Sequence, residues 1–532
     1  MKRNRSVVIF LIIIIVAELG FKVYIDSHKE DFFLDELYSY GLMNYKTAYL
    51  FDEENFRENW HDSAYFDEYL IINEDEKGDW KPIYNNQAED YHPPLYYLLL
   101  RVAASFTVGK FTKWTGLILN LCIFVLAAIT VYFIGKEIFK SKIYALLLVA
   151  VYGFSRFSAE NTLFIRMYQL LELNILLLAY WAVKNYYNKN LKIFDMLCLV
   201  AITVLGTLTQ YYFIFFCLGV FIAEIIRYIR KKQIKNLVKF LLAFIISEIL
   251  VYLIWPPYIE QLTRGSGRNE TGGNTFAEKI LSFSSRQKEY FGILDENMFN
   301  LKVSYLFAFV ILVGIIVLTI RLIKNRKSKV GFNKKINMLL VPTLIYWYIV
   351  TKTSQFIALR YILPIFVIVM IILVYLLKKE LAFLIKNKKH ALIATTAIMI
   401  IFLVMPTTKA LEYQYPESKE KIENLEKYKD IPCVYMYTHK NVLENRFTLN
   451  LNYVRKLDNV YIMNSMLFTT QELKKALQNV DISKGILVFD NTTKIEKRVN
   501  KIITELDEFS SYRKIETFTA DRIYPDDVYL VY

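Results

Sequence analysis

Apolar stretches recur along most of this sequence and constrain its fold more than any other feature. An apolar helix of about 20 residues crosses the hydrocarbon core of a bilayer. The pattern therefore predicts a polytopic membrane protein, mainly α-helical, rather than a soluble enzyme. Eleven spans are predicted, and they begin near residues 7, 115, 143, 163, 193, 211, 240, 303, 337, 357 and 391.

Two of these spans need comment. Residues 7–25 follow the basic segment MKRNR and resemble a signal peptide, but the run is long and has no clean small-residue cleavage site. An uncleaved first span is the preferred interpretation. Residues 143–155 give only thirteen uncharged residues, below the usual length of about 17 to 25 residues for a span. We expect Arg156 to extend from its end toward the membrane surface.

Charge is distributed unevenly and predicts the orientation. Residues 26–93 contain 18 acidic and 5 basic residues. Short basic loops mark the cytoplasmic side of a membrane protein. We therefore expect the N-terminus inside, residues 26–93 outside and the C-terminal segment outside, in a multi-pass cell-membrane protein of bacterial type. The basic loops lie at 136–142, 184–192, 227–239, 321–335 and 378–390.

The segment EDYHPPLYYLLLR precedes the second predicted span. If residues 95–108 crossed the membrane, every later basic loop would move outside. This run is also short and carries Arg101, so we expect a helix lying against the outer leaflet. Prolines at 93–94 suit a helix start, and they form an elbow that holds Asp90 and His92 at the membrane surface. The alternative is an ordinary turn before a helix.

Further polar residues gather at the predicted outer face. Each has a structural alternative, namely a helix cap, an arginine that reaches the headgroups, or a tyrosine of the aromatic belt. Together they place carboxylates and two arginines on one face, and a guanidinium fork matches phosphate oxygens. A nearby carboxylate would serve as a general base. The candidates are Asp35, Glu36, Arg166, Tyr168, Gln210, Tyr211, Arg360 and Tyr361.

Charged residues within the spans predict a polar pocket in the bundle. Glu18 and Lys22 are four residues apart and share a helix face, whereas Glu172 and Glu248 lie in later spans. Ionisable groups in spans usually face the bundle interior. The glycine-rich segment 263–275 is predicted to close over the site, with Arg264 or Arg268 against a donor phosphate; a plain flexible connector is the alternative.

Four of these motifs, in this order, resemble the GT-C glycosyltransferases, in particular the protein O-mannosyltransferase and aminoarabinose-transferase branch. They are the acidic pair after the first span, HPPLYYLLL, RMYQL and RYILP. The resemblance covers residues 1–405. It implies a sugar donor on a polyprenyl phosphate, no required cofactor, an optional divalent metal and Asp35 as the catalytic base. Relatives often have histidine where this chain has Gln210, which leaves open whether that turn contacts donor or acceptor.

A separate domain is predicted after Pro406. Short strands alternate with helices there, which favours a small extracytoplasmic α/β domain over 407–532. The domain division is then 1–406, including a first external loop over 26–110 with juxtamembrane helices, and 407–532. No glycine-rich phosphate loop or metal-ligand cluster is found in this domain, and no chemistry is assigned to it. Its predicted strands are 433–437, 459–463, 485–489 and 526–532, and its helices 444–457, 469–480 and 493–506.

The sequence therefore predicts an integral-membrane glycosyltransferase. It would move a sugar, with inversion, from a polyprenyl-phosphate donor to a protein, lipid or envelope-glycan acceptor outside the membrane. Asp35 would act as base, with Glu36 as second choice, and Arg166 and Arg360 would hold the lipid phosphate, aided by His92. A membrane transporter or lipid-linked sugar flippase is the alternative, although no convincing internal repeat is found. A receptor or scaffold would leave the motifs without a purpose. Nucleic acid is not expected as a partner.

Overall fold

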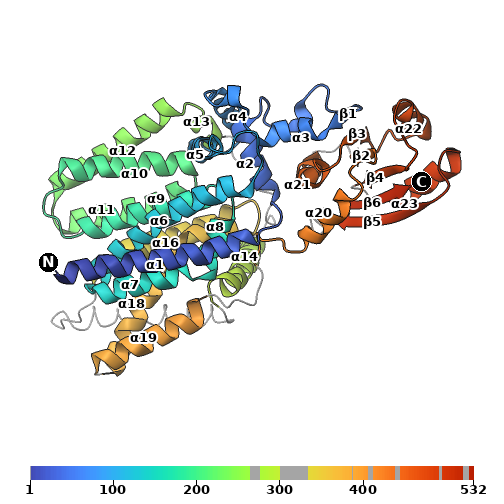
Figure 1. The fold of residues 1–532 in the computed structure, drawn as a ribbon. Helices are drawn as coiled ribbons and strands as arrows, with labels where there is room; N and C mark the ends of the chain where they lie inside the picture. Colours follow the sequence, from blue (N-terminus) through green and yellow to red (C-terminus); the bar gives the residue numbers. More distant parts are fainter. Residues whose placement is uncertain are drawn as a thin grey trace. The chain divides into compact units, whose positions relative to one another are not determined.

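The computed structural model describes residues 2–263, 276–299, 333–385, 387–404, 411–437, 444–490, 494–518 and 526–532. The chain is mainly helical and divides into two compact units (Figure 1). The helical unit comprises Met1–Ile25 and Asn120–Lys409, and the mixed unit comprises Asp26–Leu119 and Ala410–Tyr532. The two units are described separately below.

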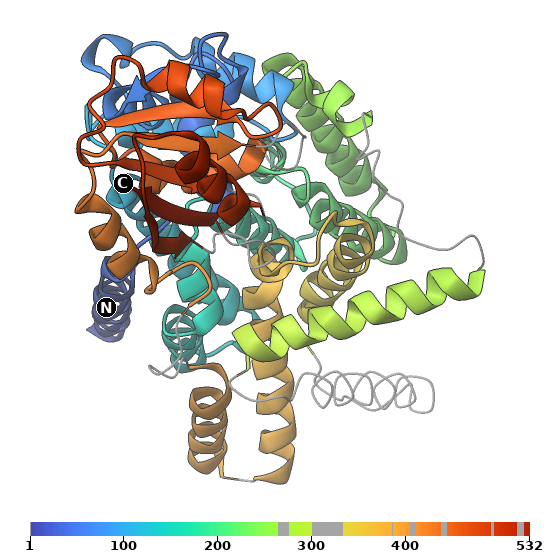
Figure 2. The same cartoon turned by 90° about the vertical axis from the view of Figure 1, so that its right-hand side faces the viewer.

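The helical unit is a bundle that includes α1, α6, α9, α10 and α11 (Figures 1 and 2), and within it α9, α10 and α11 pack against one another. A helix lies in each predicted span except the one beginning near 303, which falls outside the described residues. The helices are α1 (Lys2–Ser27), α6 (Lys113–Phe139), α7 (Lys142–Gly153), α8 (Arg156–Leu163), α9 (Tyr168–Asn185), α10 (Ile193–Thr209), α11 (Phe213–Arg230), α12 (Ile234–Ile254), α13 (Tyr258–Thr263), α14 (Phe276–Asn297), α16 (Asn337–Thr353), α17 (Leu359–Ile362), α18 (Phe366–Leu384) and α19 (Lys388–Leu403).

Four described stretches are long and apolar enough to cross a membrane, judged by length and composition alone. They are Arg5–Ser27, Lys113–Phe139, Ile234–Ile254 and Leu359–Ala382. Other apolar helices are shorter, as with α7 and α10. The apolar helices support a membrane location, whereas the number of eleven spans remains a prediction.

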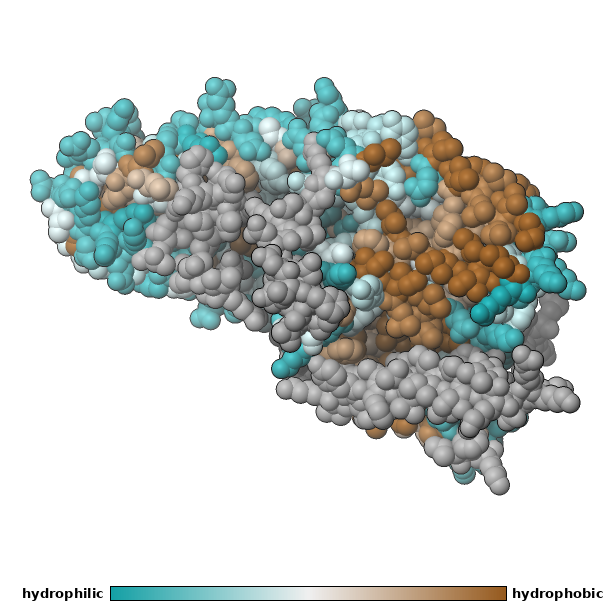
Figure 3. Space-filling view, turned by 180° about the vertical axis from the view of Figure 1, so that it is seen from behind, coloured by the Kyte–Doolittle hydropathy of each residue, from teal (hydrophilic) through white to brown (hydrophobic). Residues whose placement is uncertain are grey.

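Apolar side chains cover much of the surface of the helical unit in Figure 3. Helix α1 exposes Phe10 and Ile13, and α12 exposes Ile245 and Leu253, each with more than half of its surface accessible. A soluble monomer rarely exposes so large a contiguous apolar surface. This surface fits the hydrocarbon of a bilayer.

Polar side chains are buried inside the helical unit, as the sequence predicts for Glu18 and Lys22. Both are fully buried on α1. The Lys22 ammonium donates to Ser158 Oγ at 2.9 Å and Thr162 Oγ1 at 3.4 Å. The Glu18 carboxyl packs against Gly153, where a Cβ atom would lie 2.0 Å from Glu18 Cδ. Only glycine at this position lets α7 approach the acidic side chain so closely.

Three further charged residues in the spans test the predicted polar interior. Glu172 is fully buried and accepts hydrogen bonds from Tyr152 and Gln169. Glu248 is exposed on the surface of α12, where it accepts from Tyr258 Oη at 2.9 Å, so the prediction that it faces the interior is wrong. Arg156 does not extend to the surface either, because it is buried and pairs with Glu160 at 3.0 Å.

The mixed unit contains a six-stranded sheet of strand order β1-β3-β2-β4-β6-β5. Strands β3, β2 and β4 are parallel, and β1, β6 and β5 add antiparallel neighbours at the two sides. The four predicted strands and three predicted helices are present, whereas β1, β5 and α20 were not predicted. The strands are β1 (Trp60–Asp62), β2 (Cys433–Tyr437), β3 (Asn459–Asn464), β4 (Ile486–Asp490), β5 (Tyr512–Phe518) and β6 (Asp526–Val531), and the helices α20 (Ser418–Glu426), α21 (Glu444–Val454), α22 (Thr470–Leu477) and α23 (Ile495–Glu505).

Helices cover both faces of this sheet. Leu473 of α22 and Val499 of α23 pack with Val434 of β2 in one apolar core. On the other face, Phe447 of α21 contacts the ring of Tyr435, with centroids 5.0 Å apart. Side chains alternate between the two faces of a strand, so neighbouring residues of β2 serve different cores.

The remaining helices of the mixed unit come from the first acidic loop. They are α2 (Leu34–Asn44), α3 (Ser63–Leu70), α4 (Lys81–Glu89) and α5 (Leu95–Ala104). Helix α2 lies close to α3 because Gly41 faces Tyr69, whose ring occupies the place of a Cβ atom. Arg101 of α5 is fully buried and donates to Met43 O at 2.8 Å. At ten residues, α5 is too short to cross a bilayer.

Candidate functional site

Helix α2 carries the predicted catalytic acids in its first turn, where a negative charge is favourable. Asp35 is partly exposed. Glu36 is fully buried, and its carboxylate accepts from Lys29 Nζ at 3.0 Å and from the backbone N–H of Phe33 at 2.7 Å. Glu36 therefore starts the helix and pairs a buried lysine. This arrangement makes Asp35 the better candidate for a base.

Asp90 and His92 lie in the elbow before α5, and they are joined directly. His92 Nδ1 and Asp90 Oδ2 are 2.8 Å apart, and both side chains are partly shielded from solvent. A carboxylate at this distance fixes the orientation of an imidazole ring. Asp90 therefore holds the His92 imidazole in one orientation at the elbow.

Tyr38 connects the two acidic positions of the mixed unit. Burial raises the pKa of the Tyr38 phenol, and the charges of Asp35 and Asp90 raise it further. Its hydroxyl also has a hydrogen bond with Thr448 of α21. Asp35 and Asp90 thus act electrostatically on one phenol, although they are far apart in the sequence. The sequence analysis missed Tyr38, although it lies one helical turn after Asp35.

Arg166 and Tyr168 lie where α8 ends and α9 begins in the helical unit. Arg166 is buried, and its backbone N–H donates to Phe164 O at 2.8 Å in a tight turn. The rings of Tyr168 and Phe164 stack with centroids 5.7 Å apart. The side-chain amide of Asn120 donates to Thr162 O and Phe164 O and so fixes the same turn.

Arg360 and Tyr361 lie in α17 of the helical unit. The Arg360 guanidinium is 5.1 Å from the centroid of the Tyr361 ring, and that ring lies 5.4 Å from the ring of Tyr212. Tyr346 Oη donates to Tyr361 O at 2.8 Å. The Tyr212 phenol is within electrostatic range of Arg360, Tyr361 and Tyr168. The Arg360 guanidinium and the rings of Tyr361 and Tyr212 therefore form one group, and Tyr212 was not among the predicted site residues.

Gln210 and Tyr211 form the turn between α10 and α11. Gln210 Oε1 accepts from the backbone N–H of Tyr211 at 2.7 Å, and Tyr211 Oη donates to Gln261 Oε1 at 2.5 Å. Trp255 Nε1 donates to the same oxygen at 3.1 Å. These bonds attach the turn to α13 and to the end of α12.

The predicted site residues are divided between the two units. The mixed unit contains Asp35, Glu36, Asp90 and His92, and the helical unit contains the other described candidates. Arg264, Arg268 and the remainder of the predicted lid at 264–275 lie outside the described residues. In the part of the chain that the structure describes, no group of three His, Cys, Asp or Glu side chains is arranged to hold a metal ion.

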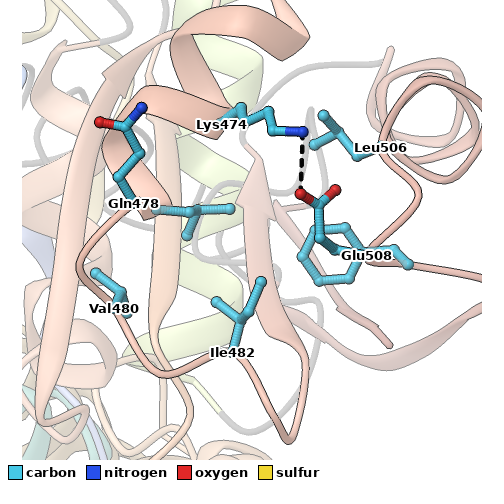
Figure 4. A pocket seen from close by; sticks show the side chains of 8 residues that line it. Lys474, Gln478, Val480, Ile482, Leu506 and Glu508 are labelled. Atoms are coloured by element: carbon cyan, nitrogen blue, oxygen red, sulfur yellow. Dashed lines mark ion pairs between the residues drawn. The ribbon is translucent and has the colours of Figure 1, made fainter.

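A pocket of about 280 Å³ lies in the mixed unit between α22 and the segment after α23. In Figure 4, Lys474 and Glu508 point toward each other at its rim, where they form a 3.1 Å ion pair. Gln478 and apolar side chains, including Leu477 and Ile482, form the remainder of its lining. The pocket contains none of the predicted site residues.

No protein-family model and no curated protein matches this sequence. Among solved structures, the chain is similar to ArnT from Cupriavidus metallidurans in the apo state, with a TM-score of 0.48 and 9% identity over 100% of this chain and 98% of that chain. A second structure of that ArnT, bound to undecaprenyl phosphate, also gives a TM-score of 0.48 and 9% identity, over 99% of this chain and 98% of that chain.

The chain is also similar to the Archaeoglobus fulgidus oligosaccharyltransferase in the apo form. The TM-score is 0.42 and the identity 12%, over 95% of this chain and 73% of that chain. ArnT and this oligosaccharyltransferase are both GT-C proteins, the superfamily that the sequence motifs resemble. At these TM-scores and identities the likeness supports no assignment of residues or substrate to this chain. Those assignments depend on its own side chains.

Proposed function

We propose that this chain is an integral-membrane glycosyltransferase that takes a sugar from a polyprenyl-phosphate donor. The observation that carries the proposal is the group formed by the Arg360 guanidinium and the rings of Tyr361 and Tyr212 in the helical unit. A guanidinium matches phosphate oxygens, and aromatic side chains provide an apolar wall for a prenyl chain. A lipid phosphate needs both features at one place.

The proposed reaction is a direct displacement with inversion. An acceptor hydroxyl oxygen attacks the anomeric carbon of the sugar while the bond from that carbon to the phosphate oxygen breaks. Asp35 accepts the proton of the acceptor, and the polyprenyl phosphate leaves with the electron pair of the broken bond. General-base assistance of this kind contributes about 10²- to 10⁴-fold to a rate.

Arg166 and Arg360 are the proposed ligands of the leaving phosphate. Arg166 is buried and lies in a hydrogen-bonded turn. A phosphate ligand that is fixed before the phosphate binds needs no reorganisation, whereas a mobile surface arginine must first be ordered. The proposed reaction requires no cofactor, and activity that persists in a chelator would support this part of the proposal. We propose a multi-pass bacterial cell-membrane protein whose N-terminus is cytoplasmic and whose mixed unit is outside.

Two experiments test the proposed function. Mass spectrometry of cell-envelope glycans, with and without the protein, identifies the sugar and the acceptor. The purified protein in lipid nanodiscs is then given radiolabelled polyprenyl-phosphate sugars and an envelope extract, and free polyprenyl phosphate is measured. Release of the lipid phosphate with transfer of label supports a transferase. Movement of intact donor across proteoliposomes without any release would show a flippase instead.

A further inference from the structure

The segment before α2 is attached to the C-terminal part of the mixed unit by its backbone and by a lysine. The backbone N–H of Glu30 donates to Gln414 O at 2.8 Å. The Lys29 ammonium donates to Tyr413 O at 2.7 Å and also pairs with Glu36 at 3.0 Å. Lys29 and Glu36 are both fully buried, and a buried ion pair requires good geometry to offset its desolvation. One lysine therefore joins the C-terminal segment to the first turn of α2.

Asp31 provides a second attachment, in this case to α21. Its carboxyl group accepts a hydrogen bond from Asn452 Nδ2 at 2.8 Å, another from Tyr453 Oη, and a third from the backbone N–H of Phe32 at 2.8 Å. Only 6% of the surface of Asp31 is exposed. A buried carboxyl group that accepts several hydrogen bonds is held in one position, because moving it breaks several bonds at once.

Helix α21 also contacts α2 beyond this attachment. The Tyr38 hydroxyl has a hydrogen bond with Thr448, and Tyr38 is the phenol beside Asp35 and Asp90. Tyr453 is held on its other side by the ring of Phe518 in β5, with centroids 4.1 Å apart. The contacts therefore run from the sheet through α21 to Asp31, which precedes α2, and to Tyr38 of α2, the helix that carries Asp35.

We propose that the C-terminal domain positions the catalytic acid, with Asn452 and Tyr453 of α21 as positioning residues for Asp35. This inference rests on the proposed function, because it assigns Asp35 the part of the base. It gives the C-terminal domain a task within the reaction without requiring a ligand site of its own. Both residues act through Asp31 and the start of α2.

The test compares Tyr453→Phe and Asn452→Ala in the full chain. Tyr453→Phe removes one hydroxyl and keeps the ring that packs on Phe518. Hydrogen–deuterium exchange is measured over residues 33–44, and exchange there should accelerate about tenfold or more, because a hydrogen bond to a charged group is lost. Transfer kinetics should show kcat lowered about 10- to 100-fold with the KM for donor unchanged, as expected when a reacting group moves by about 1 Å.

Lys456→Gln is the matched control, because Lys456 follows α21 and pairs with Glu426 of α20, away from Asp31. It should leave both measurements unchanged. Unchanged exchange over 33–44 in Tyr453→Phe and Asn452→Ala would overturn the proposal. Faster exchange with unaltered kcat would overturn it also, because the contacts would then be structural only. A wild-type protein that transfers no sugar would instead overturn the proposed function, and exchange alone would then decide whether α21 holds α2.

Discussion

The side-chain amide of Asn120 lies 2.8 Å from the carbonyl oxygen of Phe164 and donates a hydrogen bond to it. A second bond reaches Thr162 O at 3.1 Å. Asn120 is fully buried and bonds to both carbonyls where α8 ends, and Phe164 O accepts in addition from the backbone N–H of Arg166. The turn that it fixes is the one that presents Arg166.

Replacing this amide should weaken donor binding through Arg166. In Asn120→Leu, Thr162 O loses its side-chain donor, at a cost of about 1 to 3 kcal/mol for a buried unsatisfied group, and Phe164 O keeps only the backbone N–H of Arg166. The affinity for a polyprenyl-phosphate donor should fall by at least tenfold. Thr130→Val is the control, because the Thr130 hydroxyl of the same helix donates to Leu126 O one turn away and not to the turn after α8. Normal donor affinity in Asn120→Leu would show that the turn does not need the amide.

Asp35 and Glu36 should respond differently to the loss of charge. Asp35→Asn should keep its thermal stability and lose about 10²- to 10⁴-fold in turnover. Glu36→Gln should unfold at lower temperature, because removing one partner of a buried ion pair costs about 3 to 5 kcal/mol. Thermal unfolding and turnover are measured on the same samples. The double variant Lys29→Met with Glu36→Gln should recover part of the stability, and a stable, inactive Glu36→Gln would make Glu36 the base.

Arginine at 360 should be required for its shape as well as its charge. Arg360→Lys keeps the charge and loses the planar fork. The free energy of donor binding should therefore become less favourable by about 1 to 3 kcal/mol. Arg166→Lys should give a similar loss. Donor affinity is measured for both variants and for the double variant, with Lys352→Gln as the control on α16. Wild-type affinity in all three arginine variants would contradict the phosphate clamp.

The Asp31 carboxyl should give the mixed unit a pH-dependent stability. Burial raises its pKa above the ordinary value of 3.8, against the opposing effect of the Tyr453, Phe32 and Asn452 donors. A raised pKa in the folded state means that the folded chain binds the proton more tightly. The stabilisation is fully present below 3.8 and is lost as pH rises through the folded pKa.

The measurement is the unfolding temperature of wild type and Asp31→Asn from pH 3.5 upward, in steps of about half a unit across the range where carboxyl groups titrate. The stability of wild type relative to the variant should decrease as pH rises. A relative stability that increases with pH would mean that the donors outweigh burial and lower the pKa of Asp31.

Both segments of the mixed unit should be reachable from outside the cell. Cysteines introduced at Asn73 and Lys494, each at least partly exposed, should both react with a membrane-impermeant maleimide on intact cells. A cysteine at Lys232, in the basic connection between α11 and α12, should react only after permeabilisation. Labelling of only one of the two external sites would contradict the predicted orientation.

Elements with a strong local signal were predictable from the sequence. The apolar runs gave helices at the described span positions, and strands β2, β3, β4 and β6 follow the four predicted apolar segments. The buried face of α1 followed from the spacing of Glu18 and Lys22. The short α7 shows the limit of this reasoning, because twelve residues do not reveal whether a helix crosses a bilayer.

Features that depend on distant partners were not predictable. Strand β1 is three residues long and has no alternating pattern to detect, and it exists because its backbone pairs with β3. Glu36 was a candidate catalytic acid in the sequence. Its buried ion pair with Lys29, which gives it a structural part instead, is seen only in the fold. Tyr38 and Tyr212 are two of the 40 tyrosines in the chain, and the sequence does not single them out. Only the fold relates Tyr38 to Asp35 and Asp90, and Tyr212 to Arg360.

The pairing of β1 with β3 has a consequence for the order in which the chain is made. Trp60 leaves the ribosome long before Tyr461, its partner in the strand pairing. The indole N–H of Trp60 donates to Ala476 O, which is made 416 residues later. At about 5 to 20 residues per second, this interval is roughly 20 to 80 s. During it the acidic loop has neither its sheet nor the donors that satisfy Asp31. The first loop is therefore the part of the newborn chain most exposed to proteases and to mispairing until the last hundred residues are released.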